Sequence, residues 1–242
     1  MSICNFGSKS VVLSSVLLPI ILSGMLAGCA CGRIYWAKDT GIVERTRTAS
    51  YSCITYSQFL AENPEPPNGY EIKVLQKWLT RTTQDFGYTD YHSLLLFMQH
   101  GNTSIISKKI QAQIICEALR MLPCLNDFGV VGAYGSYDAY AAELLLATGK
   151  EGLPFLLPVL DDKRQAPISG SASSTSVITS QTRRCDYAHR YAEMILHGEF
   201  SLQRNIAERD KKIAEVKKDI IARQLTKNHE EQGIPNGHSM EE

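Results

Sequence analysis

The chain lacks an excess of charge of either sign, and this restricts the partners that it can have. It carries 25 lysines and arginines against 25 aspartates and glutamates. Nucleic-acid binding needs a concentrated basic surface that displaces counterions, so the balance argues against a nucleic-acid partner. The same balance gives no sign of electrostatic attraction to an anionic membrane.

Short catalytic motifs are also missing. The sequence has no Gly-x-Ser-x-Gly nucleophile elbow, no His-Glu-x-x-His helix, no calcium loop, no Gly-x-x-x-x-Gly-Lys phosphate loop and no Cys-x-x-Cys. These absences favour a protein that is not an enzyme and that uses no cofactor and no metal.

The apolar run near the N-terminus is too short for a transmembrane helix. It extends from Val11 to Met25 and contains Pro19, whereas a span needs about 20 apolar residues. A short polar head with Lys9 as its one charged side chain precedes it. This arrangement is typical of a signal peptide.

Leu26-Ala27-Gly28-Cys29 follows that run and resembles the lipobox of bacterial lipoproteins. The resemblance implies a cleaved signal peptide over residues 1–28 and a mature N-terminus at Cys29 that carries lipid. Three acyl chains would anchor durably, because each buried methylene contributes about 0.8 kcal/mol. Ala30 after the cysteine implies the outer rather than the inner membrane of a two-membrane bacterium. Cleavage without lipid, which would release a soluble protein, is the alternative.

Apolar residues recur mostly at 3.6-residue spacing, which predicts an all-α fold. Expected helices are centred on residues 51–61, 72–79, 94–98, 106–122, 137–148, 153–160 and 185–197. The predicted organisation is a lipidated N-terminus and tether over 29–69, a helical domain over 70–200, a charged amphipathic helix over 201–231 and a disordered tail over 232–242. Within the domain, residues 162–184 hold six serines and three threonines and predict a long loop.

The middle of the chain resembles a HEAT-type helical hairpin. In that family a first helix with small residues ends at a glycine, and a second begins near a proline and carries closely spaced leucines. The matching residues are Ala142, Leu145, Gly149, Pro154, Leu156, Leu160 and Asp161. The resemblance covers about 111–200 and implies a short HEAT-like stack of hairpins. Pro158 and the loop after Asp162 depart from the pattern, so an irregular helical bundle is the alternative.

Tyrosines at helical spacing supply the candidate binding residues. Tyr137 and Tyr140 belong to one stripe, and Tyr191 belongs to another. Such stripes fit core-edge packing or a ligand-binding face. If a ligand face exists, we expect it where Tyr137, Tyr140 and Tyr191 meet the serine-rich segment.

Asp186, His189 and Glu193 share one helical face and form a second constellation. They offer two or three metal ligands, but two turns of one helix rarely complete a coordination shell, so we expect no metal. A deep pocket around them would instead favour an enzyme that acts on cell-wall material.

Cysteines after Cys29 are odd in number, so at most two intramolecular disulfides can form among them. They are Cys31, Cys53, Cys116, Cys124 and Cys185. The sequence does not determine the pairing. For Cys116 and Cys185 we favour burial as small apolar side chains.

The charged segment 201–231 carries one narrow apolar stripe that includes Ile213, Val216 and Ile220. It predicts a terminal helix that docks on its own domain or stands in solvent, or else a helix for a partner or for self-association. We expect the domain to fold without it. Taken together, the sequence predicts a membrane-anchored bacterial lipoprotein that binds or scaffolds a protein partner in the cell envelope.

Overall fold

The computed structural model describes residues 41–81, 86–129, 139–169 and 171–231. In these ranges the regular structure is helical, and the sole strand-like feature is one bridge between Gln165 and Arg183. The predicted all-α class is therefore confirmed. None of the helices in these ranges combines the length and the hydropathy that a membrane span requires.

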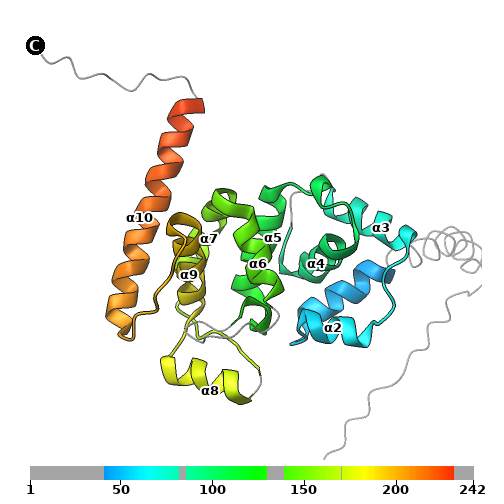
Figure 1. The fold of residues 1–242 in the computed structure, drawn as a ribbon, viewed down its shortest axis with the longest axis horizontal. Helices are drawn as coiled ribbons and strands as arrows, with labels where there is room; N and C mark the ends of the chain where they lie inside the picture. Colours follow the sequence, from blue (N-terminus) through cyan, green and yellow to red (C-terminus); the bar gives the residue numbers. More distant parts are fainter. Residues whose placement is uncertain (1–40, 82–85, 130–138, 170, 232–242) are drawn as a thin grey trace, which may run out of the picture. The chain divides into compact units, whose positions relative to one another are not determined.

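Residues 41–51 form the first described helix, and the other α-helices follow it along the chain (Figure 1). These are α2 (Tyr56–Glu62), α3 (Gly69–Leu79), α4 (Tyr91–His100), α5 (Lys108–Met121), α6 (Tyr140–Thr148), α7 (Leu153–Leu160), α8 (Ser171–Ser180), α9 (Arg184–His197) and α10 (Ile206–Glu231). Short 3-10 turns lie between them: η1 (Tyr88–Asp90), η2 (Thr103–Ile105), η3 (Asn126–Phe128) and η4 (Gly149–Gly152).

Two glycines end helices as the sequence predicts. Gly149 follows α6 with a φ of 61°, and Gly198 follows α9 with a φ of 81°. Such positive values are strained for residues with a Cβ, so glycine ends each helix without that cost. The predicted ends of these two helices are confirmed.

The first helix is part of the packed domain, and this corrects the prediction of a tether over 29–69. Ile42 and Val43 are buried in the core. The Oγ atoms of Thr46 and Ser93, on helix 41–51 and α4, lie 2.5 Å apart. Small and hydroxyl-bearing side chains make this contact, so the helix has no strong apolar period that the sequence could reveal. The compact unit begins at Ile42 rather than near residue 70.

The second half of the unit is built around α5 and α9. Both α6 and α7 pack against these two helices, and η4 connects α6 to α7. Direct contact between α6 and α7 is marginal compared with their contacts to α5 and α9. This arrangement favours the irregular bundle over a regular stack of hairpins.

Helix α8 lies inside the segment predicted to be a loop. Its sequence, Ser-Ala-Ser-Ser-Thr-Ser-Val-Ile-Thr-Ser, is poor in apolar residues. Val177 is nevertheless buried, at 2% exposure, whereas Ile178 is 62% exposed. The loop prediction for 162–184 is thus wrong over 171–180, because one buried valine is too weak a signal for a sequence pattern.

Helix α10 buries its apolar stripe in the domain core. Ile213, Val216 and Ile220 are at most 6% exposed, and α10 packs against α7 and α9. Of the predicted alternatives, docking on its own domain is the one observed. The expectation that the domain folds without this helix is not supported by this burial.

Candidate binding pocket

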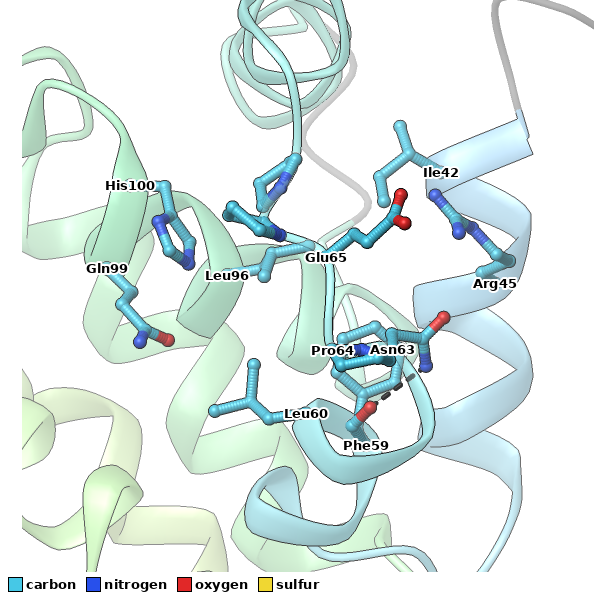
Figure 2. Close-up of a pocket in the computed structure, with 12 residues that line it drawn as sticks. Ile42, Arg45, Phe59, Leu60, Asn63, Pro64, Glu65, Leu96, Gln99 and His100 are labelled. Atoms are coloured by element: carbon cyan, nitrogen blue, oxygen red, sulfur yellow. Dashed lines mark hydrogen bonds between the residues drawn. The ribbon is translucent and has the colours of Figure 1, made fainter.

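A pocket of about 220 Å³ opens between helix 41–51, α2, the segment after α2 and the end of α4 (Figure 2). It is lined by Ile42, Arg45, Phe59, Leu60, Asn63, Pro64, Glu65, Pro66, Pro67, Leu96, Gln99 and His100. Its volume is below the roughly 300–1,000 Å³ of typical small-molecule sites. The space is of a size for an apolar side chain rather than for a large cofactor.

The local sequence fixes where α2 ends and the pocket wall begins. Asn63 caps the helix: its backbone N–H donates to Phe59 at 3.0 Å, and its Nδ2 atom donates to the same carbonyl at 2.9 Å. Three prolines occur among the next four residues and cannot donate backbone hydrogen bonds, so the helix does not resume there. The chain then passes along the pocket.

Asn68 holds the other end of this wall. Its side-chain oxygen accepts hydrogen bonds from the backbone of Tyr70 at 2.9 Å and of Glu71 at 3.0 Å. Glu71 accepts in return from the backbone N–H of Asn68 at 3.0 Å, which completes a capping box at the start of α3. The proline segment is therefore held at both ends by helix caps.

The pocket has apolar residues at its base and polar residues at its edge. Ile42, Phe59 and Leu96 are buried, whereas Gln99 and His100 are exposed. Figure 2 shows Gln99 and His100 coming from α4 on one side, opposite Ile42 and Arg45 on helix 41–51. Apolar burial with donors and acceptors at the rim is the usual composition of a binding site.

Charge at the rim is largely compensated. Arg45 forms an ion pair with Glu71 at 2.7 Å, and Glu65 stands exposed nearby. The Gln99 Oε1 atom accepts a hydrogen bond from the Tyr56 hydroxyl at 2.5 Å. Burial raises the pKa of Tyr56, so this hydroxyl stays protonated and keeps Gln99 in place. The rim thus suits a neutral ligand that hydrogen-bonds.

The structure describes two of the three tyrosines that the sequence grouped. Tyr137 and the lipobox Cys29 lie outside the described residues. Tyr140 is half-buried, and its ring meets that of Tyr56 edge-on at 5.1 Å. Tyr191 is completely buried and donates its hydroxyl to the carbonyl of Phe128, so its prediction as a ligand-binding residue is wrong. Its regular spacing reflects core packing.

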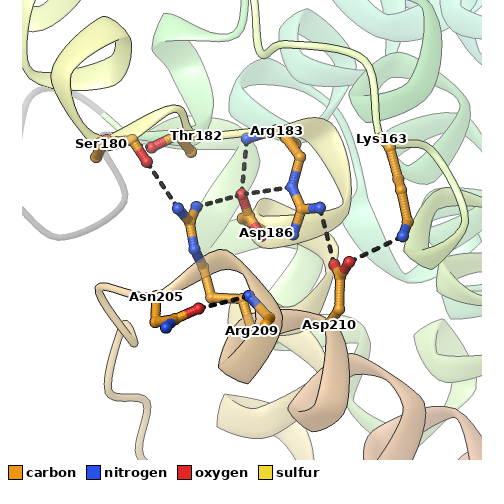
Figure 3. A network of polar contacts seen from close by, with 9 residues as sticks. Lys163, Ser180, Thr182, Arg183, Asp186, Asn205, Arg209 and Asp210 are labelled. Atoms are coloured by element: carbon orange, nitrogen blue, oxygen red, sulfur yellow. Dashed lines mark hydrogen bonds and ion pairs between the residues drawn. The ribbon is translucent and has the colours of Figure 1, made fainter.

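Asp186 is held by two arginines instead of facing a ligand (Figure 3). Its carboxylate lies 2.7 Å from Arg209 of α10 and 3.0 Å from Arg183. The two guanidinium groups bind both Asp186 oxygens, and Asp186 is 0% exposed, so the carboxylate is not accessible to a ligand. The side chain joins α10 to the start of α9, which is a structural role.

His189 and Glu193 stay close to each other on α9. Their nearest atoms, Nε2 and Oε1, lie 3.4 Å apart, and His189 is 4% exposed. Burial lowers the pKa of His189 although Glu193 opposes this effect. The ring of Phe200 packs edge-on against His189 at 5.4 Å. Within the described ranges, no group of three His, Cys, Asp or Glu side chains is placed to hold a metal ion.

A serine and a histidine also meet, between helix 41–51 and α4. Ser50 Oγ lies 2.9 Å from His92 Nδ1, a distance suited to a nucleophile and its base. Ser50 is 0% and His92 1% exposed, however, and burial lowers the pKa of His92 to about 4. A substrate has no access to Ser50, so the pair ties the two helices together.

Sequence reasoning missed the pocket, although part of its signal was visible. From the sequence, the proline-rich stretch 62–69 indicates only a break between helices, because proline lacks a backbone donor and has a fixed φ. Its position between two capping asparagines, Asn63 and Asn68, indicates an exposed segment that is fixed at both ends rather than a free linker. Nothing in the sequence shows that α4 ends beside it.

Comparison with models of known protein families, with curated proteins and with solved structures gives no match for this chain.

Proposed function

We propose that this protein is a bacterial lipoprotein, anchored through lipid on Cys29, that binds a protein partner in the cell envelope without catalysing a reaction. The pocket beside the proline segment is the observation that carries the binding part. It supplies an apolar base, a polar rim on which Arg45 is paired with Glu71, and a wall held by two helix caps. The lipobox residues support the anchor, and Ala30 favours the outer membrane.

The proposed occupant is one apolar side chain of an exposed segment of the partner. The pocket volume matches a side chain, and Asn63, Gln99 and His100 are placed to hydrogen-bond the neighbouring peptide groups. Compensation of Arg45 by Glu71 removes the strongest attraction for an anionic ligand. An extended apolar segment is therefore favoured over a charged metabolite.

Partner binding is tested with a photoreactive side chain at His100 in the native cell. We expect one discrete protein adduct. Leu60→Trp fills the pocket and should abolish the adduct, whereas Ile178→Trp, at an exposed position of α8, should leave it intact. An adduct insensitive to Leu60→Trp, or no adduct at all, contradicts the proposal.

Anchoring is tested separately by the intact mass of detergent-extracted protein. We expect acyl mass on Cys29 and its loss, together with membrane partitioning, in Cys29→Ser. Membrane association of Cys29→Ser and a native protein without acyl mass contradict the anchor. Turnover of a cell-wall fragment that His189→Ala abolishes would instead establish the alternative, an enzyme facing the periplasm.

A further inference from the structure

Cys53 and Cys124 are adjacent in space although they are far apart in the sequence. The Cys53 thiol lies close enough to Cys124 and Ser169 for both to affect its pKa, and Cys124 donates its own S–H to Asn126 Oδ1 at 2.7 Å. The distance from Cys124 Sγ to Ser169 Oγ is 3.4 Å. Both sulfur atoms therefore occupy one small polar cluster.

Hydrogen bonds from a backbone N–H to a carboxylate join the two segments that carry these cysteines. The Tyr56 N–H donates to both carboxylate oxygens of Asp127, at 2.9 and 3.1 Å. Cys53 and Cys124 each lie three residues before this contact. Ser169, which lies beside Cys124, is held by Asn126, because its N–H donates to Asn126 Oδ1 at 2.9 Å. The thiol pair is thus placed by fixed hydrogen bonds.

Solvent reaches this pair and not the other described cysteines. Cys53 is exposed and Cys124 is 8% exposed, whereas Cys116 and Cys185 are at most 2% exposed. The latter two are packed in the core, as the sequence predicts. An oxidant in solution therefore has access to Cys53 and, through it, to Cys124.

We infer that Cys53 and Cys124 form an intramolecular disulfide by exchange with a small-molecule or protein disulfide. The Cys53 thiolate attacks one sulfur of that disulfide, forming a mixed disulfide and releasing one thiolate. The Cys124 thiolate then attacks the Cys53 sulfur and releases the second. Two protein thiols lose two electrons and two protons, which the released pair of thiols carries away.

Exchange at this pair is slow without a catalyst. Although Cys53 reaches solvent, the protein covers part of its side chain, and this partial desolvation together with the neighbouring Cys124 raises the pKa of Cys53 to about 11, so little of it is thiolate at neutral pH. Raising the pH should speed the first step. Once formed, the bridge closes a loop of about 70 residues and restrains the unfolded chain.

The test uses the full chain, reduced and then incubated with glutathione disulfide. Peptide mapping without reductant should recover one Cys53–Cys124 cross-linked peptide. Oxidation should raise the Tm by about 5–10 °C. Cys53→Ser and Cys124→Ser should each abolish both the peptide and the rise in Tm, whereas Cys31→Ser should preserve them.

Other results overturn the inference. These are a stable mixed disulfide of glutathione on Cys53, a bridge from Cys53 to another cysteine, or an unreacted pair at pH 9. Because Cys53 is exposed, Cys53→Ser is expected to fold, which keeps its reduced Tm as an internal reference. The result does not depend on lipid at Cys29 or on the pocket, so it is separable from the proposed function.

Discussion

Arg209 donates a hydrogen bond to the Asp186 carboxylate at 2.7 Å, and the two side chains are 2% and 0% exposed. This contact links α10 to α9 inside the domain. Arg209 also donates to the Ser180 carbonyl, at 2.8 Å, at the end of α8. One guanidinium group thus connects three helices (Figure 3).

Replacing this arginine should destabilise the fold strongly. Arg209→Met leaves Asp186 buried with one cationic partner fewer, and breaking a buried pair typically costs about 3–5 kcal/mol. Urea unfolding measures the loss. Lys212→Ala is the matched control on α10, because its partner Glu215 is an exposed side chain and we expect little change. Equal stabilities of the two variants would contradict the role assigned to Arg209.

Truncation of α10 should have an effect that depends on where the chain is cut. Ending the chain after residue 205 removes Ile213, Val216 and Ile220, and we expect a loss on the order of 5 kcal/mol from their burial. Ending it after Gln224 keeps this stripe and removes the 56% exposed Leu225, so the Tm should hardly change. Calorimetry measures the Tm of each truncated protein and distinguishes the two cut sites. Equal melting of both truncations would restore the sequence-based expectation that the helix is dispensable.

Acid should destabilise the domain through His92. Burial lowers its pKa from 6.5 to about 4, so the unfolded chain binds this proton at a higher pH than the folded chain. The stabilising contribution of the neutral ring is complete above about pH 6.5 and is lost as the pH falls to about 4. The maximum contribution is roughly 3 kcal/mol.

The measurement is the free energy of unfolding of wild type and His92→Asn between pH 7 and pH 4. Their difference should shrink or reverse as the pH falls, because the variant has no proton to take up at this position. His189, whose pKa burial also lowers, remains in both proteins and cancels from the comparison. Parallel curves would exclude His92 as the source of the pH dependence.

Gly101→Ala should destabilise the end of α4. A Cβ at this position lies 2.6 Å from the ring of Phe97, which is completely buried. Because the ring has to move, we expect a cost of about 1–3 kcal/mol in chemical denaturation. Gly69→Ala is the control, since a Cβ there meets nothing within 4 Å and alanine favours the helix. A cost at Gly69 equal to that at Gly101 would refute the steric explanation.

Local periodicity accounts for what the sequence could predict. Helices α5 and α9 carry strong apolar periods, and the glycines after α6 and α9 mark their ends. Helix 41–51 contacts α4 through the hydroxyl-bearing Thr46, and α8 buries the isolated Val177. Neighbours that are distant in sequence, such as Ser93 for Thr46, decide whether such residues are buried. Pattern alone does not contain that information.

The pocket could not be predicted from the sequence for a related reason. Its wall comes from one continuous stretch, but Ile42 and Leu96 reach it from helices far apart in sequence. Asp186 illustrates the reverse error. Its spacing with His189 and Glu193 suggested a ligand set, while Arg209, its actual partner, lies on another helix.

The contact between Asp186 and Arg209 also sets an order on biosynthesis. A chain made from its N-terminus produces α9 before α10, so Asp186 is synthesised before Arg209. Until then the growing polypeptide lacks one of the two cations that compensate this carboxylate. The interior around Asp186 is therefore completed only after α10 has been made, and products truncated before Arg209 should be preferred substrates for quality-control proteases.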